Sequence, residues 1–279
     1  MKKACVIGSP IAHSRSPLIH NYWLKFYGLK GFYEKREVLS ADLGSFLGNL
    51  KAEGYVGCNV TIPHKEAALA FIPAVDDVVK KTGALNTVYF EGEVCRAMST
   101  DGEGFYQNLQ ATLPGFNVAN QAVAVLGAGG SARSVVERLL RVGVAEVKIF
   151  NRTLPRAEEL RHRFGSTVTV HHPDRFGDES KNIALLVNTT SQGMKGQPRL
   201  AIDLSALPSD AVVADLVYVP LKTELLQSAQ ARNLRIVGGL GMLLHQAVGG
   251  FEKWFGRRPE VTQTLFNLVA RDVDPDFQP

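Results

Sequence analysis

Cysteine is scarce in this 279-residue sequence, which contains only Cys5, Cys58 and Cys95. Their odd number and scattered positions, two of them inside apolar runs typical of strands, favour reduced thiols, and we expect neither a disulfide nor a metal site. Long hydrophobic runs are also missing, because no apolar stretch approaches the roughly 18 residues that span a bilayer. The N-terminus lacks the apolar region of a signal peptide, so we expect a cytoplasmic protein that binds no membrane.

The sequence also lacks a large excess of either positively or negatively charged residues. The 31 lysine and arginine residues are dispersed among 27 aspartate and glutamate residues, and the formal net charge is +4. This balance does not indicate a continuous basic face for nucleic acid, so a small anionic ligand is the more economical partner. With 45% hydrophobic residues, the chain has ordinary globular composition and enough length for two domains.

Apolar runs typical of strands alternate with helical periodicity along almost the whole chain, which predicts an α/β protein with parallel sheets covered by helices on both faces. In the first hundred residues the expected strands are 3–7, 33–38, 56–61 and 86–89, with a tight turn at 91–93 and helices beginning near Pro17, Ala41, Pro63 and Val75. A second series of expected strands, typical of a doubly wound nucleotide-binding domain, comprises 122–126, 147–150, 168–170, 185–188, 212–216 and 235–237.

The sequence becomes helical again after Gly239, with a final helix expected near residues 261–270. These helices could cover either domain. No tandem repeat or flexible linker separates the two series of strands, so a domain boundary near residues 102–115 depends only on the restart of the alternation.

A glycine-rich loop follows the expected strand 122–126. Residues 127–132 match the pattern G-x-G-x-x-A between a strand and a helix. The first glycine permits a tight turn, the second lets the backbone approach a pyrophosphate, and the N–H groups at the helix start face the anion. A plain glycine-rich turn is the alternative, but strand, turn, helix and a helix stop at Gly143 all agree with a dinucleotide site. The predicted contacts are Gly127, Ala128, Gly129, Gly130, Ser131 and Ala132.

The second expected strand of this domain ends without a carboxylate. NAD enzymes of this fold usually have Asp or Glu there to bind the ribose hydroxyls, whereas this chain has Asn151. Arg152, Thr153 and Arg156 follow, and their two guanidinium groups and hydroxyl can converge on a 2′-phosphate. NADP(H) is therefore the predicted cofactor. Thr153 also fits a helix N-cap, and Arg156 a surface charge, but neither alternative explains the missing carboxylate.

Two polar segments in the first hundred residues carry candidate substrate groups. Ser14 and Ser16 lie directly before an expected helix, and a strand ends in the amide, hydroxyl and amine of Asn59, Thr61 and Lys65. Taken singly, the serines also suit a turn and a helix cap, the asparagine a loop, and the lysine a solvated charge.

With these segments the chain resembles the shikimate dehydrogenase (NADP+) family essentially end to end. The matching motifs are the serine pair, residues 59–65, 83–87, 100–105, the glycine loop, 151–153, 215–218, Pro220 with Thr223, and 241–246. The resemblance implies a discontinuous substrate domain (residues 1–102 and 240–279), a Rossmann NADP-binding domain (103–239) and a cleft between them. It also implies reversible, NADPH-dependent reduction of 3-dehydroshikimate to shikimate in aromatic amino acid biosynthesis, the chorismate pathway, by a monomer or a homodimer.

The resemblance further implies the roles of individual residues. Lys65 and Asp101 are the implied catalytic pair, and the sequence leaves open which of them carries the proton. The implied substrate contacts are Ser14, Ser16, Asn59, Thr61, Lys65, Asn86, Asp101, Tyr218 and Gln246. Further implied cofactor contacts are Asp77, Leu216, Gly239 and Met242. A carboxylate with three hydroxyls suits so many polar groups, because an unmatched buried polar group costs roughly 1–3 kcal/mol.

Ser99 departs from the family pattern, in which Asn often precedes the Thr-Asp pair, and this bears on how Asp101 is positioned. Two other functions remain open. A quinate/shikimate dehydrogenase of broader substrate range would more typically have a bulkier Thr in place of Ser16. A non-catalytic, NADP(H)-binding regulatory module would not need Lys65 and Asp101, whose presence argues against it.

Overall fold

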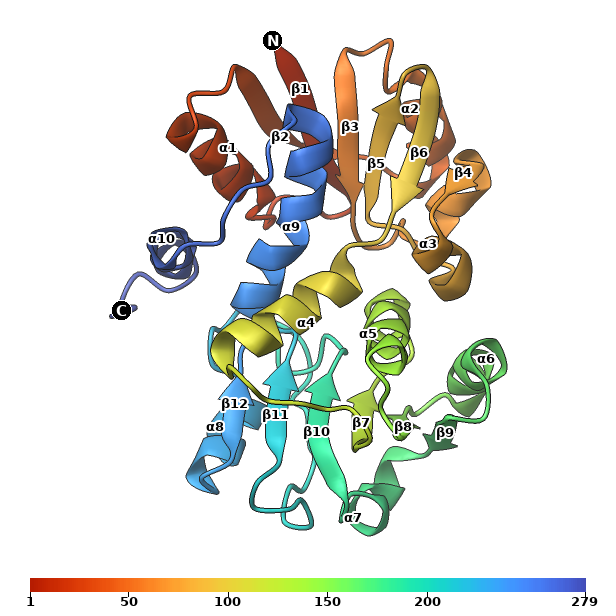
Figure 1. Cartoon of the computed structure of the whole chain (residues 1–279), viewed down its shortest axis with the longest axis vertical. Helices are drawn as coiled ribbons and strands as arrows, with labels where there is room; N and C mark the ends of the chain where they lie inside the picture. The colour runs from red at the N-terminus through yellow and green to blue at the C-terminus, as the bar shows by residue number, and fades with distance from the viewer. The chain divides into compact units, whose positions relative to one another are not determined.

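The computed structural model describes residues 1–279, and the chain forms two compact units. The first comprises Met1–Asp101 and Leu244–Val269, and the second comprises Gly102–Leu243 and Ala270–Pro279. Each unit has a six-stranded sheet of its own, so the predicted α/β class with two sheets is confirmed (Figure 1). None of the helices has both the length and the apolarity needed to cross a membrane.

The sheet of the first unit is mixed, with the strand order β2-β1-β3-β5-β6-β4. Its strands are β1 (Lys2–Gly8), β2 (Gly31–Glu37), β3 (Tyr55–Val60), β4 (Ala74–Val75), β5 (Thr87–Glu91) and β6 (Val94–Met98). Strand β1 is parallel to β2 and β3, whereas β5 is antiparallel to both β3 and β6. The expectation of a parallel sheet is wrong here, because the turn predicted at 91–93 closes a hairpin with Gly92 at φ +60°.

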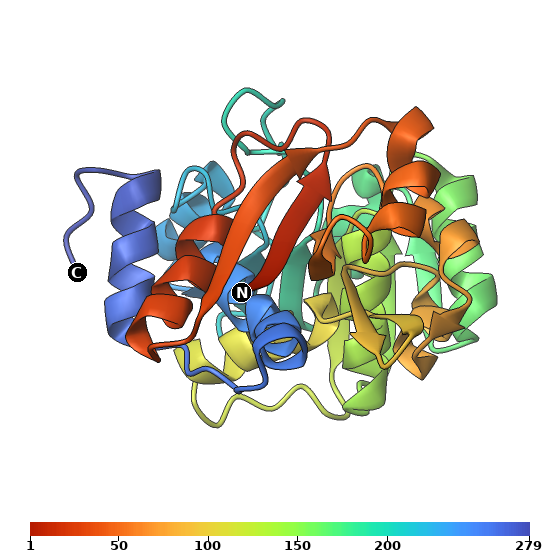
Figure 2. The same cartoon turned by 90° about the horizontal axis from the view of Figure 1, so that it is seen from above.

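Different cores cover the two faces of this sheet. On one face lie α2 (Leu43–Asn49), the 3-10 helix η2 (Ala67–Phe71) and α3 (Asp77–Thr82), above an aliphatic cluster that includes Ile7 and Val88. On the other face, α1 (Ser16–Phe26) lies beside β1 and β2 (Figure 2) and supplies rings to an aromatic cluster. The cluster consists of His20, Trp23, Tyr33, Phe251 and Trp254, the last two from α9 (Gly239–Phe255).

The helix expected to begin near Pro63 is wrong. The segment forms turns, in which the His64 N–H donates to Thr61 O at 2.9 Å, and only the short helix η2 follows. The His64 ring is fully buried, and its Nε2 lies 2.7 Å from Val38 O. This contact ties the segment to the core as a turn, and Lys65 therefore projects from a turn rather than from a helix.

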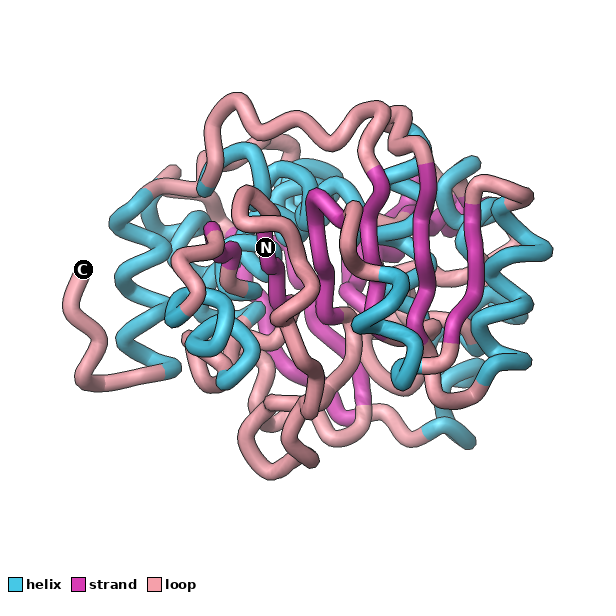
Figure 3. The backbone as a smooth tube through the Cα atoms, turned by 90° about the horizontal axis from the view of Figure 1, so that it is seen from below, coloured by secondary structure: helices cyan, strands magenta, loops and turns pink.

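The sheet of the second unit is entirely parallel and has the order β12-β11-β10-β7-β8-β9. Its strands are β7 (Ala122–Leu126), β8 (Glu146–Phe150), β9 (Val168–His171), β10 (Ile183–Asn188), β11 (Val212–Asp215) and β12 (Arg235–Val237). Counted within the unit, this is the 3-2-1-4-5-6 order of a doubly wound dinucleotide-binding sheet. In Figure 3 its strands run side by side as magenta segments.

Alternate residues of β7 face two separate cores. Val123 and Val125 pack with α4 (Asp101–Thr112), α5 (Gly130–Arg141) and α6 (Leu154–Phe164). Ala124 and Leu126 pack on the other side with α7 (Phe176–Glu179) and α8 (Glu224–Ala231). Helices thus cover both faces, as predicted for this unit. The remaining elements are the 3-10 helices η1 (Ser40–Asp42) and η3 (Pro173–Arg175) and the last helix, α10 (Gln263–Val273).

Candidate active site

A buried ion pair lies at the centre of the polar site in the first unit. The Lys65 Nζ donates to Asp101 Oδ2, and only 16% and 6% of the two side chains are exposed. The Lys65 backbone is held in place because its carbonyl accepts from the Leu85 N–H at 2.9 Å. Taking two charges out of water is costly unless other hydrogen bonds satisfy them, so the neighbours of the pair matter.

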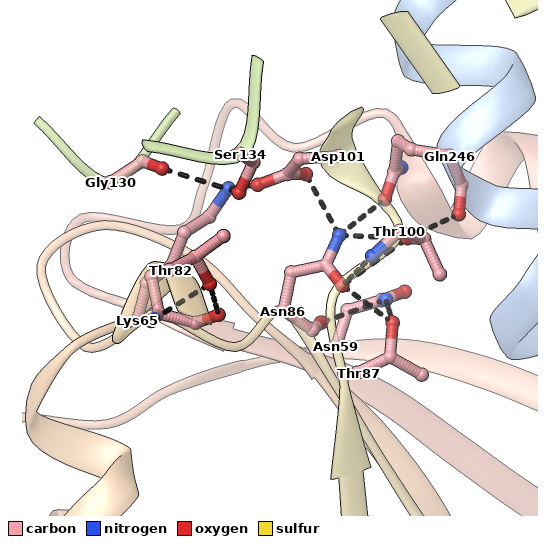
Figure 4. Close-up of polar contacts among 11 residues, drawn as sticks. Asn59, Lys65, Thr82, Asn86, Thr87, Thr100, Asp101, Gly130, Ser134 and Gln246 are labelled. Carbon is pink, nitrogen blue, oxygen red and sulfur yellow. Dashed lines mark hydrogen bonds and ion pairs between the residues drawn. The ribbon is translucent and has the colours of Figure 1, made fainter. Parts of the chain in front are cut away.

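The Asn86 amide supplies the second partner of the carboxylate. Its Nδ2 donates to Asp101 Oδ1 and to Thr100 Oγ1, each at 2.8 Å, while its Oδ1 accepts from the Thr100 N–H at 2.9 Å (Figure 4). Gln246 Oε1 lies 3.3 Å from the same Nδ2. Four predicted site residues are therefore brought together: Lys65, Asn86, Asp101 and Gln246.

Thr100 joins this group to helix α9, although the sequence did not single it out as a site residue. Its hydroxyl donates to Gln246 O at 2.8 Å. A Cβ on Gly249 would lie 2.9 Å from Thr100 Cγ2, so the glycine permits this close packing. The signal in the sequence was its place at the start of the matching motif 100–105, directly before Asp101. Ser99, the departure from the family pattern, contributes its backbone N–H to the Asp76 carboxylate.

Asn59 lies beneath this group and has protein partners for all its side-chain polar atoms. Its Oδ1 accepts from the Tyr33 hydroxyl at 2.6 Å, and its Nδ2 donates to Asn86 O and Thr87 Oγ1, each at 3.1 Å. Burial raises the pKa of Tyr33 well above its ordinary value, opposed by a hydrogen bond with Ser16, so the phenol stays protonated. The role of Asn59 as a substrate contact remains a prediction.

The serine pair lies at the start of α1. Ser16 is 6% exposed and is the first residue of the helix, and its N–H donates to Ser14 Oγ at 3.3 Å. The N-cap position belongs to Arg15, which forms no side-chain cap, and the Ser14 hydroxyl instead accepts from the first N–H of the helix. Thr61 follows β3, where its N–H donates to Ile7 O at 2.9 Å.

The glycine loop of the second unit has the geometry of an anion site. Gly127 has φ +101°, and a Cβ there would lie 2.8 Å from Thr190 Cγ2. A Cβ on Gly129 would meet nothing within 4 Å, so the backbone at the start of α5 is open to a ligand. The first-turn N–H groups of a helix have no acceptor within it. The loop therefore fits a pyrophosphate. Gly130 and Ser131 begin α5, whereas Ala128 and Ala132 are buried in the core.

The end of β8 carries positive charge and no carboxylate. Arg152 and Arg156 are exposed, and neither forms an ion pair with another residue. The Asn151 Nδ2 donates to Thr153 O at 2.7 Å. Thr153 occupies the N-cap of α6, as the sequence predicted, but its hydroxyl makes no cap bond. This arrangement fits the 2′-phosphate of NADP(H) and lacks the acid that would bind an unphosphorylated ribose.

The other predicted cofactor contacts are distributed over both units. Leu216 and Gly239 are brought together, because a Cβ on Gly239 would lie 2.3 Å from Leu216 O. Met242 is buried in the core of the second unit, and Asp77 is an exposed residue of the first unit that pairs with Lys80 at 2.9 Å. Tyr218, which was predicted as a substrate contact, also belongs to the second unit.

Two strands of this sheet end in polar residues to which the sequence analysis assigned no role, although Asp215 and Thr223 belong to the matching motifs. The Thr189 hydroxyl donates to Leu126 O at 2.6 Å, directly behind the glycine loop. Asp215 accepts from Thr223 Oγ1 at 2.6 Å and from Asn188 Nδ2 at 2.9 Å, and burial raises its pKa, opposed by these bonds. No group of three or more His, Cys, Asp or Glu side chains in the chain could hold a metal ion.

Comparison with known proteins shows which family the sequence matches. Three family models match: a shikimate dehydrogenase substrate binding domain over residues 6–88, a shikimate/quinate 5-dehydrogenase over 109–210, and a shikimate 5′-dehydrogenase C-terminal domain over 239–264. A shikimate dehydrogenase (NADP(+)) of Rhodopseudomonas palustris (strain TIE-1) is 53% identical over 274 residues, 98% of both chains. One of Mesorhizobium japonicum is 50% identical, also over 98% of both chains.

Solved structures of similar proteins share the fold. The shikimate 5-dehydrogenase of Thermus thermophilus, in complex with NADP(H) and shikimate, has a TM-score of 0.87 and 33% identity, with 98% of this chain and 100% of that chain covered. A quinate dehydrogenase of Corynebacterium glutamicum in complex with NAD has a TM-score of 0.88 and 28% identity, with 96% and 99% covered.

Proposed function

The chain belongs to the shikimate dehydrogenase family, and we propose that it catalyses the reversible, NADPH-dependent reduction of 3-dehydroshikimate to shikimate. The observation that carries this proposal is the buried Lys65–Asp101 pair, with Asn86 on its second carboxylate oxygen. A buried ion pair costs free energy of folding, because two charges are taken out of water. An amine paired with a carboxylate and surrounded by hydrogen-bonding groups suits a reaction that reduces a ketone to a hydroxyl.

Lys65 is the proposed proton donor for the reduction. When bound, NADPH would supply the hydride for the C3 carbonyl carbon, which leaves negative charge on the carbonyl oxygen. The Lys65 ammonium stabilises that charge and transfers a proton to the oxygen, so that one hydride and one proton have been added to the ketone. With 16% of its side chain exposed, Lys65 can regain a proton from solvent. In the reverse reaction it accepts the hydroxyl proton.

Asp101 orients the lysine and binds a hydroxyl of the substrate in this proposal. Asn86 and Gln246, which share its hydrogen-bonded group, bind further hydroxyls. Ser14 and Ser16 bind the carboxylate through their hydroxyls, and Thr61 with Asn59 completes the polar wall. Many fixed donors and acceptors favour a polyol acid over an apolar ketone, because each unmatched buried polar group costs roughly 1–3 kcal/mol.

The second unit holds the cofactor in this proposal. The open backbone at Gly129 and the free N–H groups at the start of α5 bind the pyrophosphate. Arg152 and Arg156 bind the 2′-phosphate, with Asn151 and Thr153 beside them. The assignments of Asp77, Leu216, Gly239 and Met242 to cofactor binding, and of Tyr218 to substrate binding, are part of the same proposal.

The direct test is the change in absorbance at the NADPH band when the purified protein meets shikimate and NADP+. We expect a rate that depends on shikimate, and lower kcat/KM values when quinate replaces shikimate or NAD+ replaces NADP+. A comparable kcat/KM for quinate would instead identify a quinate/shikimate dehydrogenase of broader range. No absorbance change with any of these pairs, from a protein that binds NADPH, would identify a non-catalytic module.

A further inference from the structure

A continuous chain of hydrogen bonds runs under the site and ends at the catalytic carboxylate. The Tyr33 hydroxyl donates to Asn59 Oδ1 at 2.6 Å, and Asn59 Nδ2 donates to Thr87 Oγ1 at 3.1 Å. The Thr87 hydroxyl then donates to Asn86 Oδ1 at 2.9 Å, and Asn86 Nδ2 donates to Asp101 Oδ1 at 2.8 Å (Figure 4 shows the last three bonds). Every bond in the chain points toward the carboxylate.

Backbone groups fix the direction of both amides. The Thr100 N–H can only donate, and it lies 2.9 Å from one end of the Asn86 amide, which must therefore be the oxygen. The backbone carbonyl of Asn86 can only accept, and it lies 3.1 Å from one end of the Asn59 side-chain amide. That end must therefore be the nitrogen. Neither amide can turn over without placing two donors or two acceptors face to face.

The two amides also fix the direction of the Thr87 hydroxyl. Thr87 has a single hydroxyl proton, and because its oxygen accepts from Asn59, that proton goes to Asn86 Oδ1. Thr87 is fully buried and Tyr33 is 1% exposed, so no solvent molecule replaces either hydroxyl. Successive bonds of one direction also polarise one another, which strengthens the last donor.

We propose that Thr87 and Tyr33 are positioning residues, which hold the Asn86 amide so that it donates to Asp101 and keeps that carboxylate aligned with Lys65. This inference rests on the proposed function, because it assigns Thr87 and Tyr33 to the reaction of Lys65 and Asp101. In a Thr87→Val variant, Asn59 loses an acceptor and Asn86 loses a donor, in a place that water does not reach. The Asn86 amide oxygen is then held by Thr100 alone, so the amide can tilt away from the carboxylate.

The kinetic test compares Thr87→Val with Thr87→Ser. We expect the valine variant to lower kcat about tenfold with less than about a threefold change in KM for shikimate, the size of one lost buried hydrogen bond. The serine variant, which keeps the hydroxyl, should recover kcat to within about threefold of the original protein. The control is Thr82→Val, because Thr82 is equally buried and its hydroxyl bonds to the backbone of Ala84 rather than to Asn59 or Asn86.

A second pair of variants tests the first donor of the hydrogen-bond chain. Tyr33→Phe removes the first donor and also the hydrogen bond with Ser16, while the Thr87 hydroxyl stays in place, and we expect a smaller fall in kcat, about threefold. The control is Tyr55→Phe, since Tyr55 is also a buried phenol of this sheet but donates to Glu34, away from the site. The inference is wrong if each variant and its control lower kcat equally, because the loss would then reflect only a less stable fold.

The amide protons of Asn86 give a readout that does not depend on turnover. In 15N-labelled protein their resonances, identified by their disappearance in Asn86→Asp, should exchange slowly with solvent. Exchange should become at least about tenfold faster in Thr87→Val but not in Thr87→Ser or Thr82→Val. Unchanged exchange in Thr87→Val overturns the inference. A protein that shows the expected exchange but does not oxidise shikimate would refute the proposed function and leave the hydrogen-bond chain intact.

Discussion

The two units differ in how the polar groups of their candidate sites are occupied. In the first unit, the charges and amides satisfy one another: Lys65 pairs with Asp101, and Asn59 and Asn86 have partners for every side-chain polar atom. In the second unit the charges are unused, because Arg152 and Arg156 have no ion-pair partner and the backbone at Gly129 is open.

This contrast matches what each site has to bind. A cofactor phosphate brings its own negative charge, so free arginines and helix N–H groups bind it without first breaking a bond within the protein. A small polyol brings weaker hydrogen-bonding groups, and its reaction needs groups held in one geometry. A network that is already satisfied supplies that geometry before the substrate arrives.

Removing the lysine should break the network of the first unit most severely. We expect Lys65→Ala to lower kcat by about 100-fold or more, the usual contribution of a general acid, with a modest change in KM. Steady-state kinetics with shikimate and NADP+ measure both constants. The matched control is Lys51→Ala, which breaks an exposed lysine–carboxylate pair with Glu93 in the same unit.

The relative changes in KM and kcat decide the role of this lysine. If Lys65→Ala raised KM strongly and left kcat intact, Lys65 would bind the substrate without acting on it. The contrast between the units would then concern binding alone.

Removing the unused charges should affect only the second unit. We expect Arg152→Ala combined with Arg156→Ala to weaken NADPH binding about tenfold to hundredfold and NADH binding less than about twofold, because only NADPH has the 2′-phosphate. Titration of the two cofactors by fluorescence measures both dissociation constants. Arg161→Ala is the control, since Arg161 lies on the same helix α6 but already pairs with Glu158. An equal loss for both cofactors would contradict the 2′-phosphate assignment.

The sequence predicted the second unit better than the first. The expected strands 122–126 and 235–237 match β7 and β12 to the residue, and the glycine loop lies where the pattern placed it. Strand, turn and helix follow one another there, so neighbours in sequence make the site. Short-range patterns predict such a site, because the buried strands are continuous apolar runs and the helices between them repeat apolar residues at helical spacing.

The polar network of the first unit depends on contacts between distant segments. Thr87 lies beside Asn59 because β5 runs antiparallel to β3, in a register that pairs these two residues. The sequence favoured a parallel sheet, in which that neighbour would be different. Hydrophobic periodicity specifies which face a residue occupies, but not which strand lies beside it. Thr100 and Tyr33 could not be identified for the same reason.

Acid should destabilise the first unit through one buried histidine. His20 is fully buried and stacks on Tyr33 with ring centroids 4.1 Å apart, and burial lowers its pKa to about 3 from the ordinary value of 6.5. The unfolded chain therefore binds a proton first as pH falls, and stability is lost between pH 6.5 and about 3. At pH 5 this loss amounts to about 2 kcal/mol relative to pH 8, at 1.36 kcal/mol per unit of pKa.

Urea unfolding followed by tryptophan fluorescence measures this loss in the right unit, because Trp23 and Trp254 are the two tryptophans of the chain and both lie in the aromatic cluster around His20. His20→Phe keeps a ring in the cluster and removes the titrating group. The difference between the free energies of unfolding at pH 8 and pH 5 should shrink by about 2 kcal/mol in this variant, while the carboxylates common to both proteins cancel. If the difference were unchanged, the buried histidine would not be the source of the acid sensitivity, and the two units would be distinguished by their polar networks alone.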